Sequence, residues 1–276
     1  MLTFTTTQAL QAYLQLQDGK TIGFVPTMGA LHTGHLSLIT QSVKATDITV
    51  CSIFVNPTQF NNSGDFDKYP RTVADDSVML EAAGCHILYA PENPDEVYNG
   101  YTMQTFDFGG LDMVMEGQFR PGHFNGMANV VYRLFEIVKP HKTFFGEKDY
   151  QQLTIVRNCV ATYFAHLDVV ACQTTREDDG LAMSSRNRRL DDSGRKIAAH
   201  IPKILFAASQ LSEFDAAKVK TWAEAEFAKV DGLKLEYFEV ADGTTLLPIE
   251  IIDKNTRLFV AAFVGDIRLI DNVGLL

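Results

Sequence analysis

Strand-like and helix-like segments alternate along the first 174 residues of the chain. The apolar run 21–26 has the composition of a buried strand, 35–46 places apolar residues at helical spacing, and 47–55 is again strand-like. The same order continues in 73–84 (helix), 85–90 (strand), 126–139 (helix), 142–146 (strand), 149–164 (helix) and 167–175 (strand). Because parallel strands need crossover connections, this alternation predicts an α/β fold, with a doubly wound, mostly parallel sheet covered by helices on both faces.

The pattern changes near residue 175. Two helical segments come first, 195–214 and 216–230, and Pro202 allows a kink in the first of them. Strand-like segments follow at 233–242, 257–264 and 267–273. Helices followed by strands are typical of an α+β domain. We therefore predict a main domain over residues 1–174 and a smaller α+β C-terminal domain over residues 175–276.

Composition narrows the class of partner. The 276 residues are 46% hydrophobic, enough for a sizeable core, and carry a formal net charge of −10. Nucleic acid and anionic membranes both attract proteins that present a basic face. We therefore expect neither nucleic acid nor a membrane as a partner, and we expect basic groups to act only locally.

The cysteines and the N-terminal residues indicate a reducing compartment. The four cysteines include no CxxC pair, and at least three lie in apolar runs, where a buried thiol is the ordinary outcome. Residues 1–15 lack the basic and apolar regions of a secretory signal, and the sequence contains no run of 18 apolar residues. We expect a cytoplasmic protein.

The first candidate site lies in "GFVPTMGALHTGHLSLI", residues 23–39. Gly29 and Gly34 have the spacing of the two P-loop glycines, but His35 stands in the place of the lysine and Leu36 in that of the Ser/Thr. A P-loop needs that lysine to reach the phosphates and that hydroxyl to bind magnesium. The P-loop hypothesis is therefore weak, and what remains is a strand, a glycine turn and the start of a helix.

His32 and His35 share one face of the first turn of that helix, which should begin near His32 or Thr33. A helix N-terminus attracts phosphate through its unpaired N–H groups and its dipole, and small Gly34 permits a close approach. The pair could be metal ligands, structural histidines, or donors to a phosphate in a transition state. Zinc is the least favoured, because no carboxylate or cysteine partner is near and the dipole opposes a cation. Phosphate binding is favoured because other segments converge on it.

Amide side chains follow the next strand. Asn56 and Gln59 stand in "FVNPTQF" directly after the buried run 47–55. Amides at the carboxyl end of a parallel strand can both donate to and accept from a hydroxy acid. Taken alone, the segment is equally explained as a polar turn built around Pro57.

Charged and amide groups open a later helix in "FFGEKDYQQL". Lys148 and Asp149 lie at its start, and Gln152 follows three residues after Asp149. Asp149 could be an N-cap and Lys148 a solvated charge. A lysine at a helix N-terminus opposes the dipole, however, which indicates an anion there.

The fourth segment, "AMSSRNRRL", follows the strand at 167–175 and contains Ser184, Ser185 and Arg186. It is either a hydrophilic turn or a phosphate clamp. Four loops with groups suited to phosphate or to a hydroxy acid thus stand at strand ends. In a doubly wound sheet, such loops open on one crevice.

Six motifs resemble the pattern of the pantothenate synthetase (pantoate–β-alanine ligase) family of the HxGH nucleotidyltransferase superfamily: "PTMGALHTGH", "FVNPTQF", "YPRT", "FGEKDYQQL", "LAMSSRN" and "RLIDN". The resemblance runs over nearly the whole chain. It implies a Rossmann-like N-terminal domain, a smaller C-terminal lid domain and a homodimer. It also implies that ATP, with Mg²⁺, and pantoate give pantoyl adenylate and pyrophosphate, and that β-alanine then gives AMP and pantothenate, a coenzyme A precursor.

The resemblance implies roles for individual residues. The catalytic groups are His32, His35, Lys148, Ser184 and Arg186. The ATP site comprises His35, Lys148, Ser184 and Arg186 together with Met28, Gly34, Gly146, Asp149, Met183 and Ser185. Pantoate and β-alanine are bound by Gln59, Gln152, Asn56, Arg120 and His123, of which the last two are almost equally explained as a structural loop. Asp75 in "TVADD", with Asp76 beside it, is the candidate ligand for Mg²⁺ held with the ATP phosphates.

Other functions stay open. Another adenylyl transferase of the superfamily would keep the first histidine motif but would not require "FVNPTQF" or "GEKDYQQL". A fragment of an aminoacyl-tRNA synthetase would need a basic face for tRNA, which the net charge opposes. A nucleotide sensor without catalysis would have little reason to keep both histidines, Lys148 and the Ser-Ser-Arg loop together.

Overall fold

The structure, a computed structural model, describes residues 1–60, 63–67, 69–211 and 215–275. It divides into two compact units. The first comprises Met1–Glu147 with Gln152–Gln173, and the second comprises Lys148–Gln151 with Thr174–Leu276. The boundary that we expected between residues 174 and 175 leaves residues 148–151 in the first domain, whereas in the structure this short segment packs with the second unit.

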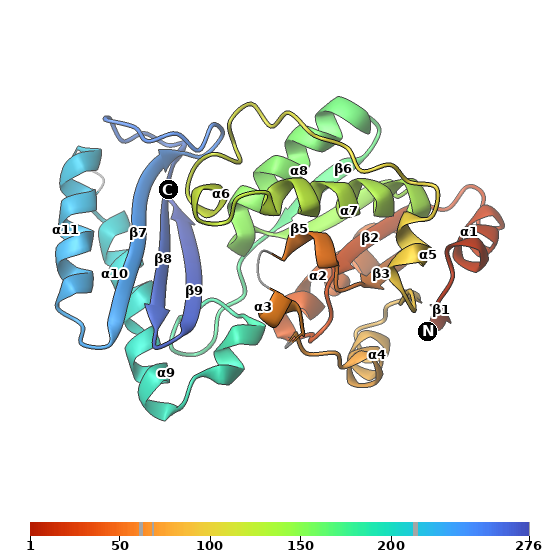
Figure 1. The fold of residues 1–276 in the computed structure, drawn as a ribbon, viewed down its shortest axis with the longest axis horizontal. Helices are drawn as coiled ribbons and strands as arrows, with labels where there is room; N and C mark the ends of the chain where they lie inside the picture. The colour runs from red at the N-terminus through yellow and green to blue at the C-terminus, as the bar shows by residue number, and fades with distance from the viewer. Residues whose placement is uncertain (61–62, 68, 212–214, 276) are drawn as a thin grey trace. The chain divides into compact units, whose positions relative to one another are not determined.

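The first unit is built on a six-stranded parallel sheet with the strand order β1-β4-β3-β2-β5-β6 (Figure 1). Its strands are β1 (Leu2–Phe4), β2 (Ile22–Thr27), β3 (Ile48–Ile53), β4 (Ile87–Tyr89), β5 (Lys142–Gly146) and β6 (Asp168–Cys172). Its helices are α1 (Thr7–Gln15), α2 (Thr33–Ala45), α3 (Ser63–Asp67), α4 (Val73–Ala82), α5 (Pro94–Tyr98), α6 (Glu116–Phe119), α7 (His123–Val138) and α8 (Tyr150–Tyr163). The predicted α/β class is therefore confirmed.

Helices cover both faces of this sheet. Adjacent residues of a strand point to opposite faces, and Phe24 and Val25 of β2 show the two environments. Phe24 meets Phe135 of α7 edge-on, with 6.2 Å between ring centroids. Val25 belongs to the hydrophobic cluster that includes Leu38 and Ile39 of α2. Because both faces are covered, the central strands β2 and β3 are largely buried and mostly apolar, as their sequences predicted.

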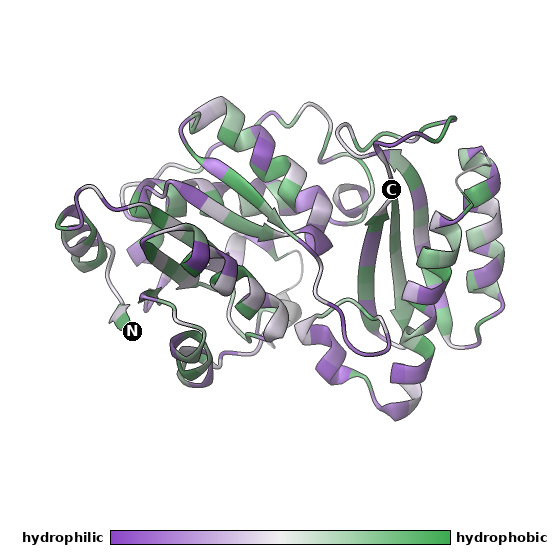
Figure 2. Ribbon diagram, turned by 180° about the vertical axis from the view of Figure 1, so that it is seen from behind, coloured by the Kyte–Doolittle hydropathy of each residue, from purple (hydrophilic) through white to green (hydrophobic). Residues whose placement is uncertain are grey.

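The second unit is a three-stranded antiparallel sheet packed against helices (Figure 1). Its elements are α9 (Asp192–Ala198), α10 (His200–Ser209), α11 (Ala216–Ala228), β7 (Leu233–Asp242), β8 (Thr256–Val264) and β9 (Ile267–Gly274). Hydrophobic and hydrophilic residues alternate along β7 and β9 (Figure 2). One face of the sheet therefore supplies the core of this α+β unit, which confirms the predicted class of the smaller domain.

The predicted helix over 195–214 is two helices. It breaks at Ala199, between α9 and α10, and not at Pro202. Pro202 lies in the first turn of α10, where a missing N–H costs no helical hydrogen bond. The last three residues of the prediction, 212–214, lie outside the described part of the chain. No helix within the described ranges is long and apolar enough to cross a membrane.

A buried carboxylate holds the loop between β2 and α2. Gly29 and Ala30 both have positive φ angles, +79° and +51°, and the second is costly for a residue with a side chain. Asp76 of α4, only 2% exposed, accepts hydrogen bonds from the backbone N–H groups of Ala30 (3.0 Å) and Leu31 (2.8 Å). Thr72 donates its hydroxyl to the same carboxylate at 3.1 Å. We call this arrangement the Asp76 clamp; it stabilises the strained turn that leads into α2.

A glycine lets α7 approach the loop after β3. A Cβ added at Gly126 would lie 2.2 Å from the carbonyl oxygen of Thr58 and 3.0 Å from the backbone nitrogen of Gln59. Both contacts are with backbone, which cannot move aside as a flexible side chain does. The 3₁₀ helix η1 (Pro57–Gln59) therefore keeps its position only if residue 126 has no side chain.

The Asp76 clamp makes a prediction for Asp76→Asn, which puts an NH₂ donor against backbone N–H groups. We expect the free energy of unfolding of the first unit to fall by about 1–3 kcal/mol, the usual cost of an unsatisfied buried donor. Urea denaturation followed by circular dichroism would measure the change. The exposed neighbour Asp75 offers the matched control, Asp75→Asn, which should change stability by no more than about 0.5 kcal/mol. Equal stabilities of the two variants would argue against the clamp.

Gly126→Ala should displace η1 from α7. We expect a loss of about 1–3 kcal/mol from overpacking, seen as a fall in Tm of about 2–4 °C for each kcal/mol. The control is Gly274→Ala, whose Cβ would meet the end of the Arg257 side chain at 3.4 Å, an ordinary contact with a flexible group. Differential scanning calorimetry of both variants would show whether the close approach at Gly126 matters, and a Tm equal to that of the parent would refute it.

Candidate active site

The histidine pair opens α2, as the sequence predicted. His32 is the N-cap, and its Nδ1 accepts from the backbone N–H of Gly34 at 3.2 Å. A neutral imidazole that accepts at Nδ1 carries its proton on Nε2, so His32 can donate from that atom. The His35 ring lies against the His32 ring, with centroids 4.1 Å apart and planes inclined by 35°. Two partly buried imidazoles thus stand together at the positive end of a 13-residue helix.

The loop after β3 is held by a buried amide. Asn56 is 0% exposed, and its Nδ2 donates to the carbonyl oxygen of Gly126 and to Oε1 of Gln59, both at 3.2 Å. Gln59, 8% exposed, in turn directs its Nε2 to the sulfur of Met28 at 2.9 Å. The structure therefore brings Met28 together with Asn56 and Gln59, which the sequence placed in the next loop.

Asn56 is completely buried, and both ends of its amide are hydrogen-bonded to protein. Its role in the substrate site stays a prediction. His123 is similar: it is buried at the start of α7, and its Nδ1 lies 2.8 Å from the carbonyl oxygen of Gln59. Asn56 thus contacts the side chain of Gln59, and His123 contacts its backbone. Arg120, at the end of α6, is half-buried and lies 3.9 Å from Glu116.

The predicted magnesium ligand Asp75 has one acidic neighbour in its helical turn, Asp76. Asp75 is exposed in the first turn of α4, and Asp76 is occupied by the clamp. Across the ranges that the structure describes, no three His, Cys, Asp or Glu side chains are grouped so as to hold a metal ion. Asp75 as the ligand for Mg²⁺ remains a prediction.

Lys148 and Asp149 lie in the 3₁₀ helix η2 (Glu147–Asp149), before α8. The ammonium group of Lys148 is 3.5 Å from Oδ1 of Asp149, and the lysine side chain is 17% exposed. The backbone carbonyl of Lys148 accepts from Asn272 of β9 at 2.8 Å. The guanidinium of Arg257 lies over the ring of Tyr150, with 3.7 Å between Cζ of the arginine and the ring centroid. These contacts fix residues 148–150 on the antiparallel sheet of the second unit.

The Ser-Ser-Arg loop forms the 3₁₀ helix η3 (Ser185–Arg189), with Ser184 as its N-cap. The Ser184 hydroxyl accepts from the backbone N–H of Arg186 at 3.3 Å. Buried Asn187 donates to Glu177 (2.6 Å) and to the carbonyl of Ala182 (3.1 Å). Arg186 itself is exposed. The loop is therefore anchored at Asn187, a residue to which the sequence gave no role, and presents its arginine to solvent.

Asn187 and Arg195 anchor the base of this loop through one shared acidic partner, Glu177. Arg195 donates to Glu177 at 2.5 Å and to Asp179 at 2.7 Å. The hydrogen bond from Arg195 lowers the pKa of Glu177 below its ordinary value, so this carboxylate stays ionised. The pairing was not predicted because nothing in the spacing of these residues identifies it.

The remaining predicted residues lie at the ends of elements. Gly34 is in the first turn of α2, Gly146 ends β5, Gln152 is half-buried near the start of α8, and Met183 precedes the Ser-Ser-Arg loop. A Cβ at Gly146 would meet nothing within 4 Å, so the space in front of it is open. None of these placements tests a role in binding.

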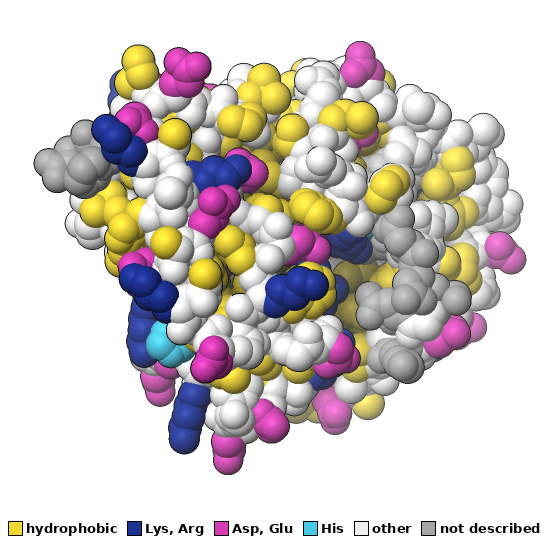
Figure 3. Space-filling model, turned by 60° about the vertical axis from the view of Figure 1, so that its left-hand side comes forward, with side chains coloured by type: hydrophobic (Ala, Val, Ile, Leu, Met, Phe, Trp, Pro, Cys, Tyr) yellow, Lys and Arg dark blue, Asp and Glu magenta, His cyan; other side chains and the backbone are white. Residues whose placement is uncertain are grey.

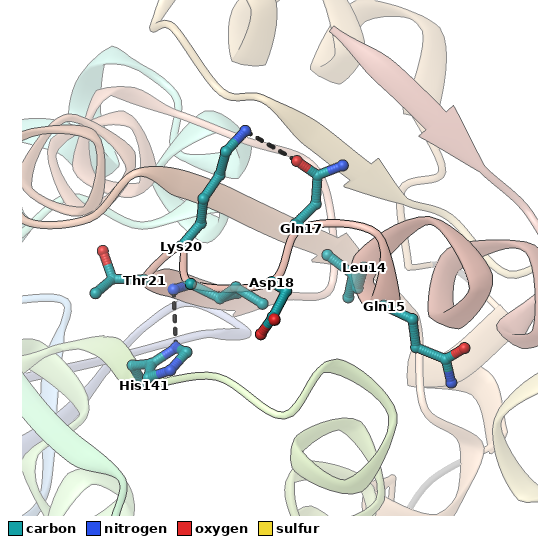
Figure 4. Close-up of a pocket in the computed structure, with 9 residues that line it drawn as sticks. Leu14, Gln15, Gln17, Asp18, Lys20, Thr21 and His141 are labelled. Carbon is teal, nitrogen blue, oxygen red and sulfur yellow. Dashed lines mark hydrogen bonds between the residues drawn. The ribbon is translucent and has the colours of Figure 1, made fainter.

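A hollow of about 430 Å³ lies at the amino end of β2, opposite the strand ends that carry the predicted site residues (Figure 4). It is lined by the end of α1, by residues up to Ile22 at the start of β2, and by His141. His141 accepts at Nδ1 from the backbone N–H of Ile22 at 3.0 Å, and Lys20 donates to Gln17 at 2.9 Å. The hollow contains none of the predicted site residues and is distinct from the strand ends that carry them.

Charged side chains are mixed on the face shown in Figure 3. Among the described residues on that face, Lys and Arg lie interspersed with Asp and Glu, without a continuous basic patch. A dispersed pattern of this kind does not generate the basic field that attracts polyanions.

Comparison with known proteins identifies the family. The family model described as Pantoate-beta-alanine ligase matches residues 2–274. The chain is 48% identical over 262 residues to pantothenate synthetase of Christiangramia forsetii, covering 94% of this chain and 93% of that protein. It is 45% identical over 273 residues to pantothenate synthetase of Bacteroides fragilis, covering 97% and 96%.

Solved structures agree in fold. The crystal structure of pantothenate synthetase from Thermus thermophilus matches with a TM-score of 0.94 at 38% identity, over 100% of this chain and 99% of that one. Pantoate-beta-alanine ligase from Francisella tularensis, complexed with beta-gamma ATP and beta-alanine, matches with a TM-score of 0.81 at 33% identity, over 99% and 97%. The resemblance drawn from the six sequence motifs is thus confirmed, and the chain belongs to the pantoate–β-alanine ligase family.

Proposed function

We propose that this protein joins pantoate to β-alanine at the expense of ATP, through a pantoyl adenylate, and releases AMP and pyrophosphate. One observation supports the proposal most strongly. The loop after β2 contains the histidine pair at the N-terminus of α2 and, through Met28, contacts Gln59 in the loop after β3. Groups suited to a phosphate and to a hydroxy acid therefore stand on neighbouring strands of one sheet edge.

The first step is attack of a pantoate carboxylate oxygen on the α-phosphorus of ATP, with pyrophosphate leaving. Negative charge accumulates on the phosphoryl oxygens, so catalysis requires donors and cations placed beforehand, and no protein nucleophile. His32 donates from Nε2, and His35 and the N–H groups of α2 act beside it. Lys148 and Arg186 neutralise phosphate charge, and the Ser184 hydroxyl donates a hydrogen bond to a phosphate oxygen.

Substrates are assigned as follows. Gln59 and Gln152 hold pantoate, and Asn56 lies near the side of amine attack. Arg120 and His123 complete the site for pantoate and β-alanine. ATP is bound by the catalytic His35, Lys148, Ser184 and Arg186 together with Met28, Gly34, Gly146, Asp149, Met183 and Ser185. Mg²⁺ enters with the ATP phosphates, where Asp75 is the proposed carboxylate. The complex of the Francisella protein with beta-gamma ATP and beta-alanine supports ATP and β-alanine as substrates here.

In the second step the amine nitrogen of β-alanine attacks the acyl carbon of the adenylate. The bond between that carbon and the phosphate oxygen breaks, the amine loses a proton, and AMP leaves with the oxygen. The homodimer that the family resemblance implies belongs to the same proposal and can be tested by analytical ultracentrifugation.

The function is tested by following pyrophosphate in the presence of ATP and Mg²⁺, first with pantoate alone and then with β-alanine added. Sustained release only with both substrates, and AMP and pantothenate in equal amounts, is the expected result. If the folded protein binds ATP but releases no pyrophosphate with either mixture, the result supports the nucleotide site and refutes pantoate and β-alanine as substrates.

His32 can be tested without removing its capping role. His32→Asn keeps an oxygen that can accept from Gly34 N–H, and asparagine is a good N-cap, but it loses the imidazole donor. We expect kcat for pyrophosphate release to fall by about 10²–10³-fold with Tm nearly unchanged, as for removal of one transition-state donor. The exposed His166 supplies the control variant, His166→Asn, which should keep full activity. Equal turnover in both variants would remove His32 from the mechanism.

A further inference from the structure

The amide of Asn56 has a defined orientation. Its Oδ1 accepts from the backbone N–H of Thr58 at 3.3 Å, and its Nδ2 donates to the carbonyl oxygen of Gly126 at 3.2 Å. A backbone N–H only donates and a carbonyl oxygen only accepts, so these two partners exclude the flipped amide. With one proton of Nδ2 donated to Gly126, the second proton needs another acceptor.

That acceptor is Gln59, and the contact orients a second amide. Asn56 Nδ2 lies 3.2 Å from Oε1 of Gln59, which leaves Nε2 of Gln59 pointing to the sulfur of Met28. Thioether sulfur is a weak acceptor. An oxygen of a bound substrate is a stronger one, and it can take the place of that sulfur. Gln59 therefore presents a donor and not an acceptor to whatever occupies the site.

Tyr98 supports this arrangement from the far side. Its hydroxyl donates to Oδ1 of Asn56 at 2.8 Å, the shortest of the three contacts that this oxygen makes. The Thr58 hydroxyl, at 3.1 Å from the same oxygen, has a single proton and also lies 3.5 Å from the Gly126 carbonyl. The Thr58 proton can therefore go to either of two acceptors, whereas the Tyr98 hydroxyl donates to Oδ1 of Asn56.

The position and the proton of Tyr98 are both secured by its surroundings. It ends α5, and its ring packs against Phe54 and Tyr101, with centroids 6.2 and 6.0 Å away. Burial raises the pKa of Tyr98 to about 12, so the hydroxyl remains a donor throughout the working pH range.

We propose that Tyr98 is a positioning residue for substrate recognition. Through Asn56 it orients the Gln59 amide, so that Nε2 donates to an acceptor oxygen of pantoate. The inference rests on the proposed function, because it concerns how the same substrate is held. It assigns to Tyr98 an effect on pantoate alone, since its hydrogen bonds lead to Gln59 and to none of the groups proposed to bind the ATP phosphates.

The test compares Tyr98→Phe with Tyr101→Phe in steady-state kinetics. Both variants lose one hydroxyl from the same row of partly buried rings, but Tyr101 donates to Asn129 at 2.9 Å, outside the Asn56–Gln59 pair. For Tyr98→Phe we expect the KM for pantoate to rise about threefold to tenfold, the factor that one neutral hydrogen bond contributes. The KM values for ATP and β-alanine should equal those of Tyr101→Phe, and so should Tm.

A second variant removes another donor to the same oxygen. Thr58→Val, which keeps the size of the side chain, should raise the KM for pantoate in the same direction. If neither variant raises it above the Tyr101→Phe value, or if all three KM values rise together with a fall in Tm, Tyr98 has only a structural role and the inference is wrong.

Failure of the proposed function has a different signature. It appears in the parent protein, as absence of pyrophosphate release with pantoate and β-alanine, and the inference then falls with it. An active parent protein whose Tyr98→Phe variant matches Tyr101→Phe refutes only the inference.

Discussion

The arrangement of the first unit depends on one constraint: polar groups buried at the carboxyl edge of the parallel sheet must be hydrogen-bonded. Ala30 and Leu31 are buried in the turn after β2, and the Asp76 clamp satisfies the N–H groups of both. The turn after β3 is satisfied by Asn56. These hydrogen bonds tie the loops that carry the histidine pair and Gln59 to the rest of the first unit.

Loops positioned by hydrogen bonds suit the proposed chemistry. Transfer of an adenylyl group to a carboxylate brings anions together, and the protein gains most by placing donors before the charge develops. A histidine that is also an N-cap meets this need, since the hydrogen bond that caps the helix also determines which ring nitrogen carries the proton. In the second unit, the pairing of Arg195 with Glu177 and Asp179 fixes the base of the loop that carries Arg186.

Periodicity predicted the fold because it reports local facts: both-face burial of β2 and β3, and the start of α2 at His32–Thr33, follow from neighbouring residues. The break at Ala199 was missed because proline is tolerated in a first turn. The distant partners of Asp76 and Asn56 could not be predicted. The backbone N–H groups that Asp76 accepts from lie 45 and 46 residues away in the chain. Tyr98 and Gly126 lie 42 and 70 residues from Asn56. A carboxylate beside another carboxylate looks like a metal ligand until the backbone that approaches it is known. Tyr98 belongs to none of the six motifs, and only the folded chain brings its hydroxyl to Asn56.

The central claim is that the pantoate carboxylate is activated as an adenylate. Its most direct test is transfer of oxygen from pantoate labelled with ¹⁸O in both carboxylate oxygens, with AMP and pantothenate examined by mass spectrometry. An adenylate requires one labelled oxygen to leave with AMP and the other to stay in the new amide. Unlabelled AMP, or ADP and phosphate in place of AMP and pyrophosphate, would contradict the account.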